Sequence, residues 1–145
     1  MKAEVTFLNG MTFQATDEKS FELTLGTGFE DQERQGLSPM GLILIGLAGC
    51  TAIDVISILR KQRQDVTGFK IEVEGERAQD HPRVYTHIQL KYIITGHNLE
   101  EKSVERAIEL SSTKYCSVHA MLVATVEIST SYQIIEAASE ASSSS

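Results

Sequence analysis

The sequence predicts an α+β fold in which antiparallel sheets surround one central, buried helix. Two observations support this prediction: several short segments alternate apolar and polar residues, and one long helical stretch between them carries no charge. The chain has 145 residues, 41% of them hydrophobic, which suits one domain with one core. We expect this domain to cover residues 1–135 and a disordered tail, rich in Ser and Ala, to occupy residues 136–145.

Three short strands are expected before the helix. Val5 and Phe7 alternate with polar residues, and Asn9-Gly10 is a pair that favours a tight hairpin turn. Residues 11–15 would form the returning strand, and residues 21–25 a third strand with its apolar side chains on one face.

The central helix is expected from Pro39 to about Lys61. Ser38 is a suitable N-cap, because its hydroxyl accepts a hydrogen bond from a free backbone N–H, and proline fits the first helical position. No charged residue occurs from Met40 to Ile53, so the helix has no polar face there and must be surrounded by protein. The uncharged stretch is too short to cross a bilayer. We therefore expect a second copy of the chain to help cover the helix.

The second half of the chain begins with an expected long hairpin. Apolar residues alternate with polar ones in residues 69–74 and again in residues 84–94. Val84 is expected to face inward, together with Ile88, Leu90, Tyr92 and Ile94.

A second helix and a last strand are expected after the hairpin. Asn98 and Glu101 have the spacing of a capping box, which predicts a helix from Leu99 to about Lys114. Cys116 would lie at or near the start of a short helical turn, and a strand over residues 126–134 would complete the domain.

Composition excludes several classes of partner. The net charge is -7 and no basic stripe is visible, so we expect no nucleic-acid partner. The first residues lack the apolar core of a signal peptide, so we expect a cytoplasmic protein without a membrane partner. Cys50 and Cys116 are the two cysteines, which fits reduced, reactive thiols in the cytosol; two buried structural cysteines are the alternative.

The segments around the two cysteines carry recognisable motifs. Leu37-Ser38-Pro39-Met40, running into Leu47-Ala48-Gly49-Cys50-Thr51-Ala52, resembles the first cysteine helix of the OsmC/Ohr superfamily. Cys116-Ser117-Val118-His119 resembles the second cysteine segment, and the order of elements is similar up to about Ile134. The resemblance implies an OsmC-like fold in an intertwined homodimer. It also implies thiol-dependent reduction of hydroperoxides, with Cys50 peroxidatic and Cys116 resolving.

The sequence departs from the family pattern at two positions. Members of the peroxidase branches carry an Arg on the loop after the third strand and a Glu at the start of the cysteine helix. Gly28 and Met40 stand at these positions here. Arg34, a few residues further along the loop, is an auxiliary candidate for the missing cation; the alternative is an ordinary solvated arginine.

His119 and Asp54 are further polar residues near the cysteines in sequence. His119 is an auxiliary candidate that would orient or protonate a leaving oxygen near Cys116, with a packing or hydrogen-bonding role as the alternative. Asp54, one helical turn beyond Cys50, is a candidate to hold a neighbouring hydrogen-bond donor; the favoured alternative is a cap or an ion pair with the basic end of the helix. Cys50, Cys116 and His119 are plausible zinc ligands, but no fourth ligand is evident, so we expect neither a metal nor a cofactor.

Two functions remain after these steps. The first is a peroxidase that uses the Cys50 and Cys116 pair to reduce organic hydroperoxides or hydrogen peroxide and a dithiol reductant to regenerate the thiols. The alternative is a noncatalytic or redox-responsive OsmC-like protein that binds a small hydrophobic molecule at the dimer interface.

Overall fold

The structure is a computed structural model that describes residues 1–138. The chain forms two compact units, the first spanning Met1–Ile43 and the second beginning at Leu44. The single domain expected over residues 1–135 stays a prediction. Residues 139–145 of the expected tail lie outside the described residues, and the last strand ends at Glu136.

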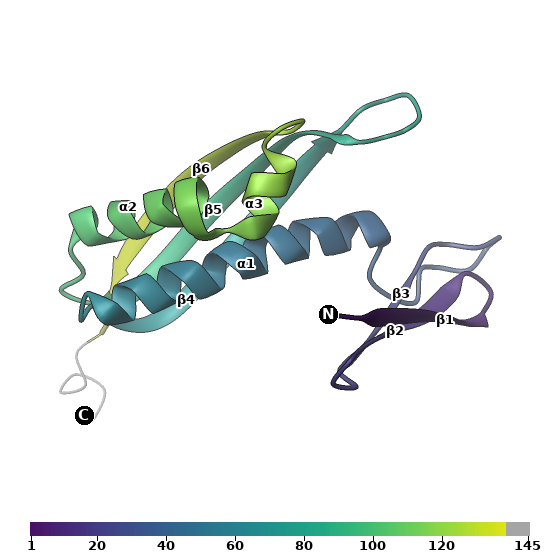
Figure 1. Cartoon of the computed structure of the whole chain (residues 1–145), viewed down its shortest axis with the longest axis horizontal. Coiled ribbons are helices and arrows are strands. Elements are labelled where there is room, and N and C mark those ends of the chain that lie inside the picture. Colours follow the sequence, from purple (N-terminus) through teal and green to yellow (C-terminus); the bar gives the residue numbers. More distant parts are fainter. Residues whose placement is uncertain (139–145) are drawn as a thin grey trace. The chain divides into compact units, whose positions relative to one another are not determined.

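The first unit contains a three-stranded antiparallel sheet. Its strands, in the order β1-β2-β3, are β1 (Ala3–Asn9), β2 (Thr12–Asp17) and β3 (Glu22–Gly26) (Figure 1). The expected hairpin is confirmed, but its turn lies one residue later than the sequence indicates, because Asn9 pairs with Thr12. Gly10 adopts the left-handed backbone conformation that this turn needs, with a φ of 52°. Apolar side chains of this sheet remain exposed, among them Val5, Phe7 and Phe21.

Helix α1 spans Pro39–Lys61, as the sequence predicts. The Ser38 hydroxyl accepts a hydrogen bond from the Gly41 N–H at 2.9 Å, which confirms the N-cap. One face of the helix is buried, and its four buried residues, Leu47, Thr51, Val55 and Leu59, recur at every fourth position. Burial of the opposite face depends on the second subunit, which stays a prediction.

The length argument against a membrane span needs a correction. Only the uncharged stretch is short; the whole of α1 has 23 residues, and a window within it has a mean hydropathy of 2.3, enough by length and composition to cross a membrane. In the structure, however, one face of this helix packs inside the second unit, as in the core helix of a folded domain.

The second unit is built on a sheet with the strand order β4-β5-β6. Its strands are β4 (Asp65–Arg77), β5 (Tyr85–His97) and β6 (Glu127–Glu136). The β4–β5 hairpin is antiparallel as expected, but β6 runs parallel to β5, which corrects the expectation of purely antiparallel sheets. The physical reason is the crossover: helical segments between β5 and β6 return the chain to the end at which β5 began.

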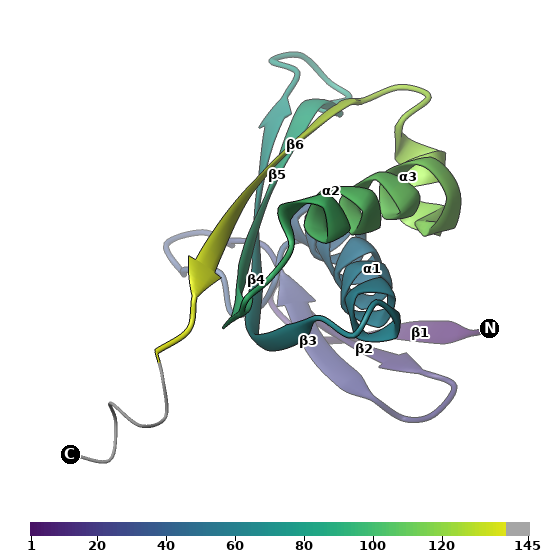
Figure 2. The ribbon, with the colours of Figure 1, turned by 90° about the vertical axis from the view of Figure 1, so that its left-hand side faces the viewer.

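That crossover consists of α2 (Glu101–Leu110), a π-helical turn (Ser111–Tyr115) and α3 (Ser117–Leu122). Helices α1 and α2 lie side by side on one face of the β4-β5-β6 sheet (Figures 1 and 2). This layered arrangement brings α1 close to the segment around Cys116.

A β-bulge changes the expected inward face at the start of β5. Val84 is 52% exposed, whereas Tyr85 is buried. Tyr85 pairs with Arg77 and His87 pairs with Glu76, so Thr86 is an extra residue that reverses the alternation at this point. The remaining four residues of the expected inward face are fully buried.

The expected capping box at the start of α2 is wrong. The N-cap is Glu100, and its side chain makes no capping hydrogen bond. Asn98 has a φ of 51°, which is left-handed and differs from the extended geometry of an N-cap. Its backbone N–H donates instead to the carboxylate of Glu136 at the end of β6. A contact with a distant strand therefore determines the backbone at this helix start.

Candidate active site

The two cysteines lie close together although they belong to different elements. Cys50 is half-buried in α1, Cys116 is 3% exposed just before α3, and both are free thiols. The two sulfur atoms and a carboxylate oxygen of Asp54 all lie within 4.8 Å of one another. The structure thus brings together the pair that the family resemblance implies and adds Asp54 to it.

Helix geometry places Cys50 and Asp54 on the same side of α1. They are four residues apart, so their side chains are neighbours about one turn from each other. The expected role of Asp54 in holding a neighbouring donor is confirmed, because its carboxylate accepts a hydrogen bond from the Ser111 hydroxyl at 2.9 Å. The favoured alternative, a pair with the basic helix end, is wrong. Asp54 is therefore held toward the second cysteine segment.

The π-helical turn and α3 fix the position of Cys116. The Cys116 N–H donates to the Ser111 carbonyl at 2.9 Å, which closes the π-helical turn. Cys116 then becomes the N-cap of α3, since its Sγ accepts a hydrogen bond from the His119 N–H at 3.4 Å. The predicted helical start at this cysteine is confirmed. Short π-helical segments are rare and often occur at functional sites.

A chain of buried hydroxyl groups supports the cysteine pair. The Thr51 Oγ1 lies 2.7 Å from the Tyr92 hydroxyl and 2.8 Å from the Ser111 Oγ. Because the single hydroxyl hydrogen of Ser111 is donated to the Asp54 side chain, Ser111 must accept from Thr51, which in turn accepts from Tyr92. All three hydroxyl hydrogens therefore point along one chain toward Asp54, an arrangement in which each hydrogen bond polarises the next.

Burial and negative neighbours keep Cys116 protonated. Burial is the largest of the effects that raise the pKa of the Cys116 thiol to about 11; its hydrogen bond with Cys50 and the negative charges of Cys50 and Asp54 add to it. The His119 N–H acts in the opposite direction. No lysine or arginine contributes to this balance in the described residues. Cys116 is thus a neutral thiol near pH 7.

His119 is a neutral imidazole in this environment. Burial lowers the pKa of its side chain, because desolvation disfavours the charged form. Its Nδ1 atom is buried and has no hydrogen-bond partner among the described residues. His119 thus contacts Cys116 through its backbone, and its expected auxiliary role through the imidazole stays a prediction.

The residues expected to supply or replace the missing cation lie in the first unit. Gly28 and Arg34 are exposed on the loop after β3, and Met40 is in the first turn of α1. The catalytic role of Arg34 stays a prediction.

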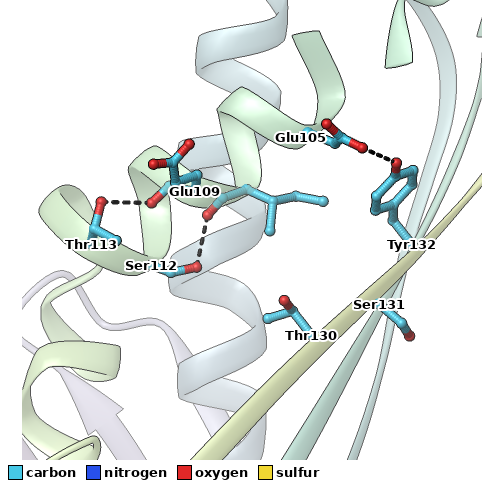
Figure 3. A pocket seen from close by; sticks show the side chains of 8 residues that line it. Glu105, Glu109, Ser112, Thr113, Thr130, Ser131 and Tyr132 are labelled. Carbon is cyan, nitrogen blue, oxygen red and sulfur yellow. Dashed lines mark hydrogen bonds between the residues drawn. The ribbon is translucent and has the colours of Figure 1, made fainter. Parts of the chain in front are cut away.

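A groove of about 560 Å³ between α2, the π-helical turn and β6 is a second candidate site (Figure 3). The Tyr132 hydroxyl lies 2.6 Å from Glu105 Oε1 and 2.7 Å from Glu101 Oε1. One phenolic hydrogen cannot be donated fully to both carboxylates, and these two groups raise the pKa of Tyr132. The groove is lined by neither a thiol nor an imidazole, so the cysteine cluster is the better candidate for chemistry.

The roles of three residues in the cysteine site were not predicted from the sequence. Thr51 was part of the recognised motif without a role of its own, and Tyr92 was expected only as a core residue. Ser111 had no distinguishing signal, because serine is common in helix ends and loops. The spacing of four between Cys50 and Asp54 did link Asp54 to the thiol, but it gave no sign that Ser111 would be its donor.

Comparisons with known proteins show which family the chain resembles in sequence and in fold. Residues 30–131 match the model of the family described as OsmC-like protein. The chain is 39% identical over 137 residues to protein YhfA of Escherichia coli K12, an alignment that covers 94% of this chain and 100% of YhfA. A hypothetical protein from Aquifex aeolicus is similar in structure, with a TM-score of 0.84 and 34% identity, over 94% of this chain and 97% of that one.

A protein with lower sequence identity also has a similar fold. The organic hydroperoxide resistance protein OsmC from Legionella pneumophila has a TM-score of 0.66 and 16% identity, over 91% of this chain and 95% of that one. The family match and the two more similar relatives together show that this chain belongs to the family of OsmC-like proteins.

Proposed function

We propose that this protein is a thiol-dependent peroxidase that reduces organic hydroperoxides or hydrogen peroxide through Cys50 and Cys116. The observation that carries the proposal is the closeness of two free thiols, whose sulfur atoms lie within 4.8 Å of each other. Proteins with a similar fold are named for resistance to organic hydroperoxides, which supports the choice of substrate class.

The reaction would use both sulfur atoms in turn. The Cys50 thiolate attacks the distal peroxide oxygen and the O–O bond breaks, so that Cys50 keeps the OH group as a sulfenic acid. The alkoxide, or hydroxide in the case of hydrogen peroxide, takes a proton from solvent and leaves as the alcohol or as water. The Cys116 sulfur then attacks the Cys50 sulfur and forms a disulfide, while the hydroxyl group leaves as water with the proton of the Cys116 thiol. A dithiol reductant restores both thiols by two exchange steps.

The different surroundings of the two cysteines support this order of events. Cys50 is half-buried and can meet a substrate, whereas Cys116 is 3% exposed. The raised pKa of Cys116 also makes it the poorer first nucleophile near pH 7, because the thiolate is the reactive form.

The same electrostatics argue for a slow enzyme. Asp54 lies beside both sulfur atoms, and its negative charge is one of the effects that raise the pKa of the Cys116 thiol. A lower thiolate fraction at Cys116 slows its attack on the oxidised Cys50 sulfur. Slow chemistry favours a second candidate function, a redox-responsive protein in which the same disulfide forms as a switch. Such a protein would bind a small hydrophobic molecule at the dimer interface.

We also propose that the chain works as a cytoplasmic homodimer. The exposed face of α1 and the exposed apolar residues of the first sheet are surfaces that water solvates poorly. Because proteins of this family are commonly dimeric, we propose that a second copy of the chain covers these surfaces.

The test is turnover of cumene hydroperoxide with dithiothreitol as the reductant, in a buffer that contains a metal chelator. We expect slow turnover in the native protein and none above background in Cys50→Ser. In Cys116→Ser, a single equivalent of peroxide should leave a Cys50 sulfenic acid that dimedone traps. Turnover in Cys50→Ser equal to the native rate would contradict the proposal.

Arg34 and His119 are tested in the same assay. Loss of activity in Arg34→Ala, with partial recovery in Arg34→Lys, would identify Arg34 as the catalytic cation. His119→Gln keeps the backbone N–H that contacts Cys116 and removes the imidazole. A lower rate of turnover in this variant would show that the imidazole takes part in the reaction.

A further inference from the structure

We propose that Cys50, Cys116 and Asp54 together bind one zinc ion in the reduced protein. From the sequence we expected no metal, since His119 beside the two cysteines left a fourth ligand missing; the structure instead places Asp54 beside the two sulfur atoms. The inference concerns the reduced thiols alone, so it does not depend on peroxidase activity.

The distances between the three side chains suit a metal ion. Their two sulfur atoms and one carboxylate oxygen all lie within 4.8 Å of one another. Zinc binds sulfur at about 2.3 Å and oxygen at about 2.0 to 2.2 Å, so ligand atoms around a tetrahedral zinc lie roughly 3.5 to 4 Å apart. Small rotations of three side chains would therefore complete the site without a shift of the backbone.

The elements that carry these ligands are already fixed. Cys50 and Asp54 project from neighbouring turns of the same helix, and Cys116 is held at the N-cap of α3. The Ser111 hydroxyl donates to Oδ2 of Asp54, which leaves the other carboxylate oxygen available to a metal. Hydrogen bonds of this kind orient the ligands in known metal sites. Thr51 and Tyr92 in turn fix Ser111 from within the core.

The chemistry of the three ligands selects the kind of ion. Two cysteine sulfurs are soft ligands that favour zinc over magnesium or calcium, and one carboxylate is compatible with zinc. Two thiolates and one carboxylate would repel one another at such short distances unless a cation lies between them. Three protein ligands also leave a fourth position open to water or a small molecule, as in exchangeable or catalytic zinc sites.

Zinc at this position would compete with disulfide formation. It would hold both sulfurs as thiolates bound to the same ion, so that neither is free to attack a peroxide. The metal-bound form would thus be a protected state of the thiol pair, and removal of zinc would be required before the sulfurs can react.

The experiment uses cobalt and zinc as probes of the full chain, reduced and treated with a chelator that is then removed. Titration with Co²⁺ should saturate at one ion per chain, with the thiolate-to-cobalt charge-transfer absorption and the visible bands of four-coordinate cobalt. Zn²⁺ should displace cobalt and abolish both. Native mass spectrometry should show one zinc per chain. Absence of the charge-transfer absorption at saturating cobalt would overturn the proposal.

Matched variants separate the ligands from nearby groups. Asp54→Asn retains an acceptor for Ser111 but removes the anionic ligand, and should weaken zinc binding by more than the roughly 10- to 100-fold typical of a lost supporting hydrogen bond. Asp65→Asn, at an exposed carboxylate of β4, should leave zinc affinity unchanged. Zinc affinity that stays at the native value in a folded Asp54→Asn protein would also overturn the proposal.

Single cysteine variants provide a second readout in case Asp54→Asn fails to fold. Cys50→Ser and Cys116→Ser should each halve the intensity of the charge-transfer absorption per cobalt, because each removes one of two thiolates. Full intensity in either variant would show that its cysteine is not a ligand. The metal titration contains no peroxide, so a protein that binds no metal can still be a peroxidase. The peroxidase assay contains a chelator, so a protein without peroxidase activity can still bind zinc.

Discussion

The two faces of helix α1 have opposite surroundings. On one face, Leu47 and Val55 are fully buried inside the second unit, to which they belong. On the other face, Ile45 is exposed and Ile53 is 70% exposed in the single chain. Cys50 and Asp54 lie between these faces and are half-buried.

This difference explains how a reactive group can be both rigid and accessible. The buried face fixes the backbone of α1 and, through Thr51, anchors the hydroxyl chain. The open face lets a substrate, an ion or a second subunit approach the helix. A cysteine in the middle of the buried face would be a poor first nucleophile, because a peroxide could not reach it and its thiolate would be strongly desolvated.

The largest expected effect comes from a charge on the open face. If a second copy of the chain covers this face, Ile53→Asp would bury an unpaired carboxylate, at a cost of about 3 to 5 kcal/mol, and weaken the dimer more than about 100-fold. Sedimentation at micromolar concentration should show a native dimer and a monomeric variant. Lys102→Asp, at an exposed position of α2, should remain dimeric. A native protein that is monomeric in this experiment would contradict the proposal that a second subunit covers the open face of α1.

A slightly smaller effect is expected on the buried face. Leu47→Ala should lower the free energy of unfolding by about 2 to 5 kcal/mol, because it removes packed atoms and leaves a cavity. Urea denaturation at one fixed protein concentration measures this change. Val84→Ala, at a position that is 52% exposed, serves as the control and should change stability by less than about 0.5 kcal/mol. Equal effects in the two variants would contradict the assignment of the buried face.

The Cys116 thiol, which lies beside Cys50 and Asp54, should make the free energy of unfolding depend on pH. The pKa of Cys116 is raised to about 11 in the folded chain, above a value of about 8.5 for an unfolded cysteine. The folded state holds this proton more tightly, so the stabilisation is complete below about pH 8.5 and disappears as the pH rises through 11.

Denaturation of the reduced, chelator-treated protein between pH 8 and pH 11 checks this dependence. Cys116→Ser has no group that titrates at this position, so the decrease should be smaller in the variant. An identical decrease in both proteins would show that other groups cause it.

The smallest expected effect concerns the far end of the hydroxyl chain. Tyr92→Phe removes the hydrogen bond to Thr51 while Thr51 can still donate to Ser111, so stability should fall by about 0.5 to 1.5 kcal/mol. Thermal or urea denaturation measures the change. Because the contacts of Asp54 and Cys50 are retained, the affinity for Co²⁺ should change less than in Asp54→Asn. A cobalt affinity reduced as much as in Asp54→Asn would show that the whole chain positions the carboxylate.

Local patterns in the sequence determined most of the secondary structure and the identity of the thiol pair. The Ser38 cap, the bounds of α1 and the fully buried residues of β5 follow from capping chemistry and from the spacing of apolar side chains. These features depend on residues within a few positions of each other. The pairing of Cys50 with Cys116 came from the family motif, since spacing alone does not place two distant cysteines together.

Only the tertiary structure decided the direction of β6, the bulge at Thr86 and the membership of Asp54 and Ser111 in the site. Ser111 is 60 positions from Thr51 and 57 from Asp54, so its partners depend on how the crossover lays α2 and the π-helical turn against α1. A serine or an aspartate has the same appearance in a sequence whether it faces solvent or a buried partner. Its role is fixed by which groups the folded chain brings within hydrogen-bonding distance, because a buried polar group is stable only when such a partner is present.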